Sequence, residues 1–176
     1  MLKKILLALA ALTAAFLVYP APRPATFLVA GSASIKAPPE KVFAMINDFK
    51  RRDAWSLWKK RAPAMSRTFG SDVRSGAGAT YAWQGNAEVG EGRMEIAESV
   101  SPSRIRIKLD FVKPFEAHNI VDFTLRPQGG ATDVTWAIYG PMPYISKLIG
   151  IFCSMDSMIG KDFDAGLADL KAVSEK

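Results

Sequence analysis

Through the middle of the chain, apolar residues alternate with polar ones. The clearest alternation runs from Arg104 to Phe111, where Ile, Ile, Leu and Phe occupy one parity and charged residues the other. A period of two is typical of a strand with one buried face. Similar patterns predict further strands at residues 26–36, 79–84, 88–97, 118–126 and 132–139. Short turns would join the strands from residue 79 onward into an antiparallel meander.

From Tyr144 to about Val173 the apolar residues recur every three or four positions. This spacing lines one face of an α-helix, which we expect to run unbroken for roughly 45 Å. Its apolar face would comprise Leu148, Phe152, Met155, Ile159, Phe163, Leu167 and Leu170. So long a face needs a large partner surface, so we expect a curled sheet around the helix and any cavity between the two. The inward face of that sheet would comprise Ile105, Ile107, Leu109, Val121, Phe123, Val134 and Trp136.

We expect a shorter helix to begin at residues 38–40. Proline is tolerated in a first helical turn, and a glutamate there interacts favourably with the positive end of the helix dipole. After it, residues 50–61 hold six cations around Trp55 and Trp58. Basic groups attract anionic lipid and tryptophan prefers the membrane interface, so this stretch is a candidate entrance to the cavity. The alternative is a short solvated helix that tucks its tryptophans into the domain.

The first 25 residues have a different character, with Lys3 and Lys4 before an uncharged run from Ile5 to Tyr19 and three prolines between residues 20 and 24. We expect a signal anchor or signal peptide at 1–19, a proline-rich tether at 20–25 and one folded domain at 26–176. The short apolar run favours a signal peptide, since roughly 20 residues cross a bilayer comfortably. The prolines disfavour cleavage.

We therefore expect an uncleaved anchor, with a single N-terminal pass through a bacterial-type inner membrane and the domain exported to the periplasm. Cleavage would instead release a soluble periplasmic or secreted protein.

Charge and residue counts exclude several classes of function. The net charge is +6, and without Lys3, Lys4 and Arg23 it is +3, since 20 basic residues then face 17 acidic ones. That is too little to indicate a nucleic-acid partner. With one cysteine and one histidine, the usual His and Cys metal clusters cannot be built, and we expect neither metal nor cofactor. The alternation along its strand puts the single histidine, His118, on the outward face, where it would not serve as a base inside the cavity.

Polar and aromatic residues expected on the inner surface are the candidates for ligand binding. Asn119 shares the parity of Val121 and Phe123, and a buried amide requires a partner from the protein, water or a ligand. Neighbouring backbone is the alternative to a ligand. Aromatic residues and methionines gather where strands should meet the long helix, and some of them could line an apolar pocket. The pocket candidates are Trp55, Trp58, Tyr81, Trp83, Met94, Asn119, Trp136, Tyr144, Phe152 and Met155.

Two motifs stand out within this order of elements: Ala-Pro-Pro-Glu-Lys-Val-Phe at residues 37–43 and Gly-Ala-x-Tyr-x-Trp at residues 78–83. With them, the stretch from Thr26 to Glu175 resembles the START-like (SRPBCC) superfamily, in particular its polyketide cyclase/dehydrase-like branch. The resemblance implies an α+β helix-grip fold, in which a curved antiparallel sheet wraps a long C-terminal helix and encloses a cavity for apolar molecules. It carries over no catalytic residue.

Three functions remain open. Binding or carrying a hydrophobic small molecule or lipid at the membrane needs only an apolar cavity, and it is the function that we expect first. A cyclase- or dehydratase-like enzyme for a polyketide-like substrate would need an inward acid or base, for which the candidates are Glu116, Asn119, Tyr81 and Tyr144. The third is a protein-interaction module with a filled interior.

Overall fold

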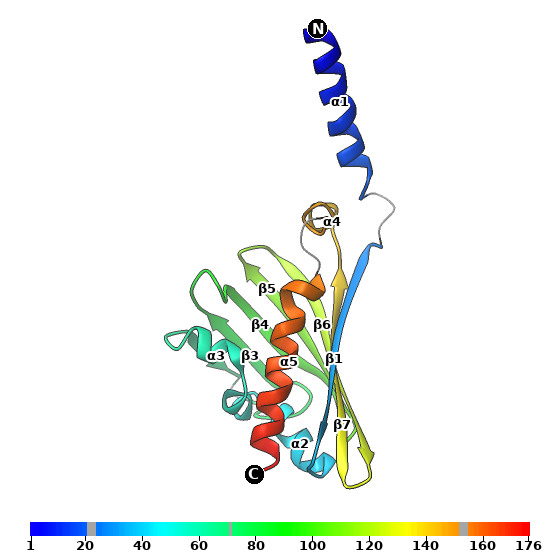
Figure 1. Cartoon of the computed structure of the whole chain (residues 1–176). Helices are drawn as coiled ribbons and strands as arrows, with labels where there is room; N and C mark the ends of the chain where they lie inside the picture. The colour runs from blue at the N-terminus through cyan, green and yellow to red at the C-terminus, as the bar shows by residue number, and fades with distance from the viewer. Residues whose placement is uncertain (21–23, 71, 152–154) are drawn as a thin grey trace.

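The alternating segments form one seven-stranded antiparallel sheet that curves around a C-terminal helix (Figure 1). The computed structural model describes residues 1–20, 24–70, 72–151 and 155–176. The strand order is β1-β7-β6-β5-β4-β3-β2. The strands are β1 (Thr26–Ile35), β2 (Ser66–Phe69), β3 (Thr80–Gln84), β4 (Glu91–Val100), β5 (Arg104–Lys113), β6 (Ala117–Gln128) and β7 (Ala131–Pro141).

The register of the central strands agrees with the alternation in the sequence. Ile105 and Ile107 of β5 are fully buried on the concave face. Between them, Arg106 points to the convex face, where its Nε and Nη2 each donate a hydrogen bond of 2.8 Å to Asp122 of β6. The predicted inward and outward faces of these strands are therefore confirmed.

Helix α5 (Met155–Ser174) lies across the concave face, and its inward residues Phe163, Leu167 and Leu170 are buried (Figure 1). At one end of the sheet, α2 (Pro39–Ile46) contacts α5, β6 and β7. Its buried residues Val42, Phe43 and Ile46 belong to the apolar core there. The 3-10 helix η1 (Arg51–Ala54) and helix α3 (Leu57–Arg61) follow α2 and flank α5. Sheet and helices therefore enclose the interior from both sides.

The prediction of one unbroken helix from Tyr144 is wrong. In this region the structure has two helices, α4 (Tyr144–Ile149) and α5, and Gly150 is the C-cap of α4. The backbone tightens there, because the Ile151 N–H donates to the Leu148 carbonyl, three residues back, at 3.1 Å. Glycine favours the end of a helix at this position, since a glycine inside a helix is about 1 kcal/mol less favourable than an alanine.

Two strand predictions also need correction. Strand β2 was missed, because its four residues Ser-Arg-Thr-Phe show little apolar alternation at this edge of the sheet. Strand β4 begins at Glu91 rather than at residue 88, because residues 85–90 form a loop. This loop is closed by the Gly85 N–H, which donates to the Gly90 carbonyl at 2.9 Å. Gly90 has a φ of +64°, a backbone conformation that glycine adopts without strain.

Helix α1 (Leu2–Val18) extends away from the domain, beyond the end of the sheet that carries α4 (Figure 1). Among the helices of the described residues, none combines the length and the apolar character needed to cross a membrane. The expected transmembrane anchor therefore has no support from the structure.

Candidate functional site

Strand register brings one row of side chains side by side across the concave face. Tyr81 of β3 pairs with Met94 of β4, Met94 with Leu109 of β5, and Leu109 with Asn119 of β6. In an antiparallel sheet, directly paired residues point to the same face. The row therefore presents a phenol, a thioether, an isobutyl group and an amide to the interior.

A cavity of about 230 Å³ lies between this row, the segment from η1 to α3, and α5. Its walls are mainly aromatic and aliphatic, and all four tryptophans of the chain line it. Ligand cavities typically measure roughly 300–1,000 Å³, so this one suits a small molecule or a single acyl chain.

Seven of the ten pocket candidates line this cavity: Trp55, Trp58, Tyr81, Trp83, Met94, Asn119 and Trp136. Tyr144 belongs to α4 and is not among the lining residues. Phe152 lies outside the described residues, and so does the side chain of Met155. A binding role stays a prediction for all ten.

Trp136 of β7 is the centre of an aromatic cluster on the cavity wall. Its ring stacks on Phe163 of α5 with 4.2 Å between centroids, and it meets the edge of Trp55 at 5.9 Å. Gly166 permits this approach, because a Cβ at that position would stand 2.7 Å from the Trp136 ring. The Trp136 Nε1 is buried and has no hydrogen-bond partner among the described residues.

Arg52 is a buried cation in the cavity wall that was not among the pocket candidates. It is only 9% exposed, and its guanidinium lies 5.2 Å from the ring centroid of Trp55 and 5.8 Å from that of Phe49. Its Nη1 lies 3.3 Å from the sulfur of Met94. Burial lowers the pKa of Arg52 to about 10, because removal from water disfavours its charged form.

Arg52 forms no ion pair within the described part of the chain. The adjacent carboxylate, Asp53, instead accepts hydrogen bonds from Arg67 and from Lys59, the latter at 3.3 Å. The signal that could have revealed Arg52 is the spacing Phe49, Arg52, Trp55, because residues three apart share one face of a helical turn.

Two further polar groups reach the cavity. Burial raises the pKa of the Tyr81 hydroxyl, which lies near Arg52. Asn119 is 7% exposed, and its side chain lies against Gly140. In the described residues its amide forms no hydrogen bond, and the neighbouring-backbone partner considered from the sequence is not observed there.

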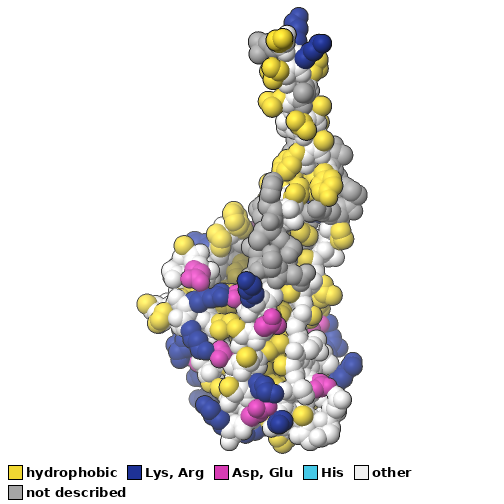
Figure 2. Space-filling model, in the orientation of Figure 1, with side chains coloured by type: hydrophobic (Ala, Val, Ile, Leu, Met, Phe, Trp, Pro, Cys, Tyr) yellow, Lys and Arg dark blue, Asp and Glu magenta, His cyan; other side chains and the backbone are white. Residues whose placement is uncertain are grey.

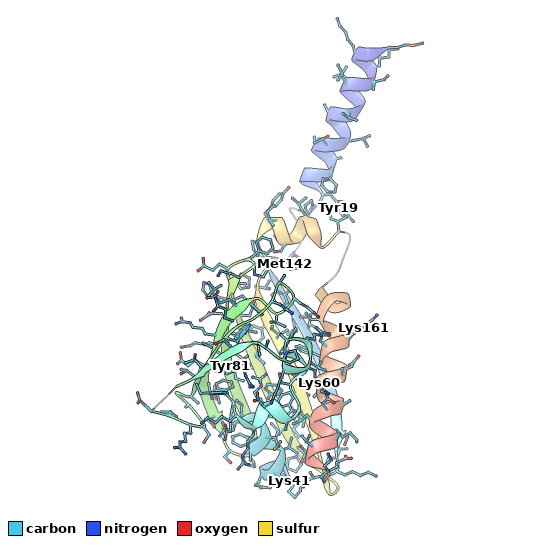
Figure 3. All side chains as sticks on the ribbon, turned by 90° about the vertical axis from the view of Figure 1, so that its left-hand side faces the viewer. Tyr19, Lys41, Lys60, Tyr81, Met142 and Lys161 are labelled. Carbon is cyan, nitrogen blue, oxygen red and sulfur yellow. The ribbon has the colours of Figure 1, made fainter. Side chains whose placement is uncertain are left out.

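The rim of the cavity is held by ion pairs between α3 and α5. The Arg61 guanidinium donates two hydrogen bonds to Asp162, one of them 2.9 Å long, and its Nε lies 3.5 Å from Glu88. The bond to Asp162 raises the pKa of Arg61. Lys60, labelled beside α5 in Figure 3, pairs with Asp169 at 2.6 Å.

Residues 50–61 thus border the cavity, as the entrance hypothesis requires. Lys59, Lys60 and Arg61, however, form ion pairs with acidic residues of the domain: Asp53, Asp169 and Asp162. Basic and acidic groups alternate over this face of the domain in Figure 2.

Within residues 1–20, 24–70, 72–151 and 155–176, no group of three or more His, Cys, Asp or Glu side chains could hold an ion. His118 is exposed on the convex side, where its Nδ1 lies 2.8 Å from Asp110. Its outward position follows the parity of its strand.

Known structures share this architecture. Protein CV1439 from Chromobacterium violaceum is 18% identical with a TM-score of 0.59, and the match covers 85% of this chain and 97% of that one. Protein MLL2253 from Mesorhizobium loti is 15% identical with a TM-score of 0.60, over 84% and 96% of the two chains. The Aha1 dimer from Colwellia psychrerythraea is 14% identical with a TM-score of 0.58, over 85% and 96%. At these identities the likeness shows the fold alone.

No match was found among curated proteins. The family model for "Polyketide cyclase / dehydrase and lipid transport" matches residues 26–175. The helix-grip fold and the resemblance seen in the sequence are therefore confirmed. The chain belongs to the polyketide cyclase/dehydrase and lipid transport family of the START-like superfamily.

Proposed function

We propose that the domain binds and carries a hydrophobic small molecule or a single-chain lipid in the cavity between the sheet and α5. The observation that carries this proposal is the apolar, tryptophan-lined cavity of about 230 Å³. Membership of a family described by lipid transport as well as by cyclase activity supports it. The volume favours one chain or one small ring system over a two-chain phospholipid.

The state of the acidic residues supports binding rather than catalysis. Asp53, Glu88 and Asp162 line the cavity, and each of them lies in an ion pair with a basic side chain. These ion pairs occupy the carboxylates that a general acid or base would have to offer to a substrate. Of the acid-base candidates named from the sequence, Tyr81 and Asn119 line the cavity, whereas Glu116 and Tyr144 do not.

Titration with the neutral fluorophore N-phenyl-1-naphthylamine tests the proposal. The purified chain should bind it with saturable enhancement of the probe's emission. Leu109→Trp, which fills the cavity, should abolish this binding, whereas Val112→Trp, on the exposed face of the same strand, should leave it unchanged. No saturable binding by the wild type, or equal binding by the two variants, would refute a ligand cavity at this position. Mass spectrometry of an organic extract of the protein would identify a co-purified ligand.

We also propose that the ligand is exchanged at a membrane, with the domain held there by its N-terminal segment and exported. Exposed apolar side chains support this idea: Leu7 and Leu12 of α1 are 70% and 69% exposed, and Ile145 of α4 is 65% exposed. Phe115, 79% exposed, occupies the turn between β5 and β6. Strand pairing puts this turn at the end of the sheet where β7 leads into α4.

Fractionation of cells that express the full chain tests the membrane proposal. The protein should sediment with membranes and resist extraction by carbonate. The double variant Phe115→Ser, Ile145→Ser should weaken the contact of the domain with vesicles, whereas Val100→Ser, also an exposed apolar position, should not. Recovery of the full chain in the soluble fraction would contradict the proposal, and a periplasm-dependent reporter fused to the C-terminus would test export.

A further inference from the structure

Among the residues that the structure describes, no acidic side chain pairs with Arg52, and this cation lies where a ligand in the cavity can reach it. The side chain is buried in the cavity wall against two aromatic rings and the sulfur of Met94. A buried charge is costly unless an opposite charge or hydrogen bonds compensate it. Rings and a thioether compensate it only in part, so the guanidinium retains unused hydrogen-bond donors.

The other charged residues that line the cavity do not neutralise Arg52. Asp53 pairs with Arg67 and Lys59, while Asp162 and Glu88 both pair with Arg61. Each acidic residue on the wall is thus paired with a cation nearer the surface. In the described part of the chain, the missing anion has no protein source.

We propose that the ligand carries an anionic oxygen group, a carboxylate or a phosphate, which binds to Arg52. This inference rests on the proposed function and assigns the chemical class of the ligand. The planar guanidinium matches both groups, since its fork of N–H donors can bond two oxygens at once. Tyr81, which lines the cavity and interacts electrostatically with Arg52, offers a hydroxyl as a further donor. Figure 3 labels Tyr81 on the sheet.

The remainder of the ligand follows the apolar wall away from Arg52. Met94, which contacts Arg52, pairs with Leu109, and Leu109 pairs with Asn119. With strands about 4.8 Å apart, Asn119 lies two strands or roughly 10 Å from Met94. The ligand is therefore an amphipathic anion, with its charged end at Arg52 and an apolar body directed toward Leu109 and Trp136.

A comparison of three eight-carbon compounds tests this assignment. Octanoate, monooctyl phosphate and octan-1-ol share the chain and differ in the head group, and each is used to displace N-phenyl-1-naphthylamine at pH 7.5. At least one anion should bind the wild type about ten- to a hundredfold more tightly than the alcohol, since hydrogen bonds to charged groups are strong. The anion that shows the larger advantage distinguishes a carboxylate ligand from a phosphate ligand.

Variants identify the group that recognises the anion. Arg52→Met should remove the advantage of the anion and keep the affinity for octan-1-ol within about twofold. Arg51→Met, which removes an exposed cation from the same 3-10 helix, should keep the advantage.

Two results would overturn the assignment: octan-1-ol bound by the wild type as tightly as both anions, or an anion advantage that survives in Arg52→Met. The first result is measured on the wild type and does not depend on the folding of any variant. Either result leaves the apolar cavity intact as a binding site, because the neutral probe and the alcohol would still bind. Failure of the neutral probe itself would contradict the proposed function instead.

Discussion

Replacement of Arg52 by methionine should stabilise the ligand-free protein. Most substitutions of a buried residue destabilise a fold, because they leave a cavity or an unpaired group. Here the native residue is itself a buried charge without an ion-pair partner among the described residues, in a wall of rings and a thioether. Methionine is similarly long and unbranched and is apolar, so it can fill the same space without the charge.

The magnitude follows from the lowered pKa. A fall from the ordinary value of arginine to about 10 means that burial costs roughly 3 kcal/mol, at 1.36 kcal/mol for each pKa unit. Methionine forfeits the contacts of the cation with the Trp55 and Phe49 rings, which contribute roughly 0.5–1 kcal/mol each. The expected net gain in the free energy of unfolding is therefore about 1–2 kcal/mol.

The dependence on pH has a definite sign. The folded protein binds the Arg52 proton less tightly than the unfolded chain, since the pKa is lower in the folded state. The cost of burial is therefore fully present below about pH 10 and is relieved as the pH rises from there toward the ordinary pKa of arginine. The advantage of Arg52→Met over the wild type should shrink across that window.

Urea unfolding followed by tryptophan emission provides the assay. With a slope near 2 kcal/mol per molar urea, the midpoint should rise by roughly 0.5–1 M for Arg52→Met. Arg51→Met serves as the control and should change stability by less than about 0.5 kcal/mol, because its side chain is exposed. A loss of 1 kcal/mol or more in Arg52→Met would show that the arginine stabilises the fold, and the reasoning from an uncompensated charge would be wrong.

Two further predictions concern other parts of the domain. Gly166→Ala should cost about 1–3 kcal/mol and perturb the emission of Trp136, because the new methyl group would stand 2.7 Å from its ring. Gly160→Ala in the same helix, with no described atom within 4 Å of the new methyl, should gain up to about 1 kcal/mol in urea unfolding. The hydrogen bond to Asp110 raises the pKa of His118, so NMR titration of this single histidine should give a value above 6.5 that falls in Asp110→Asn. The stability that this pair contributes should be present below pH 6.5 and disappear as the pH rises through the raised pKa. An unchanged His118 titration in the variant would contradict the bond.

The sheet could be predicted from the sequence because several strands show, independently of one another, which of their faces is buried. A shift of one residue in β5 would turn Arg106 inward and Ile105 outward, which no neighbouring strand would accept. The same parity put Asn119 inside and His118 outside, as the structure has them. Pocket candidates on these strands therefore line the cavity.

Positions that depend on tertiary contacts were harder to predict. Helical spacing continues across Gly150, and periodicity alone does not say that α4 ends there. The cationic run from residue 50 to 61 is typical of a solvent-exposed segment. Nothing in the sequence distinguishes the buried Arg52 from the exposed Arg51 beside it. Only the packing of η1 against Met94 turns one of them inward.

The identity of this inward cation matters for the chemistry of the cavity. Guanidinium is more weakly hydrated than ammonium and lies flat on aromatic rings, so Trp55 and Phe49 can hold it in an apolar wall without a carboxylate. A lysine at the same place would concentrate its charge on one strongly hydrated group, and burial would drive it to the neutral form. A carboxylate partner from the protein would in turn occupy the donors of the arginine. With a pKa still near 10, Arg52 stays charged at neutral pH, and the donors that no described residue engages can bind a ligand.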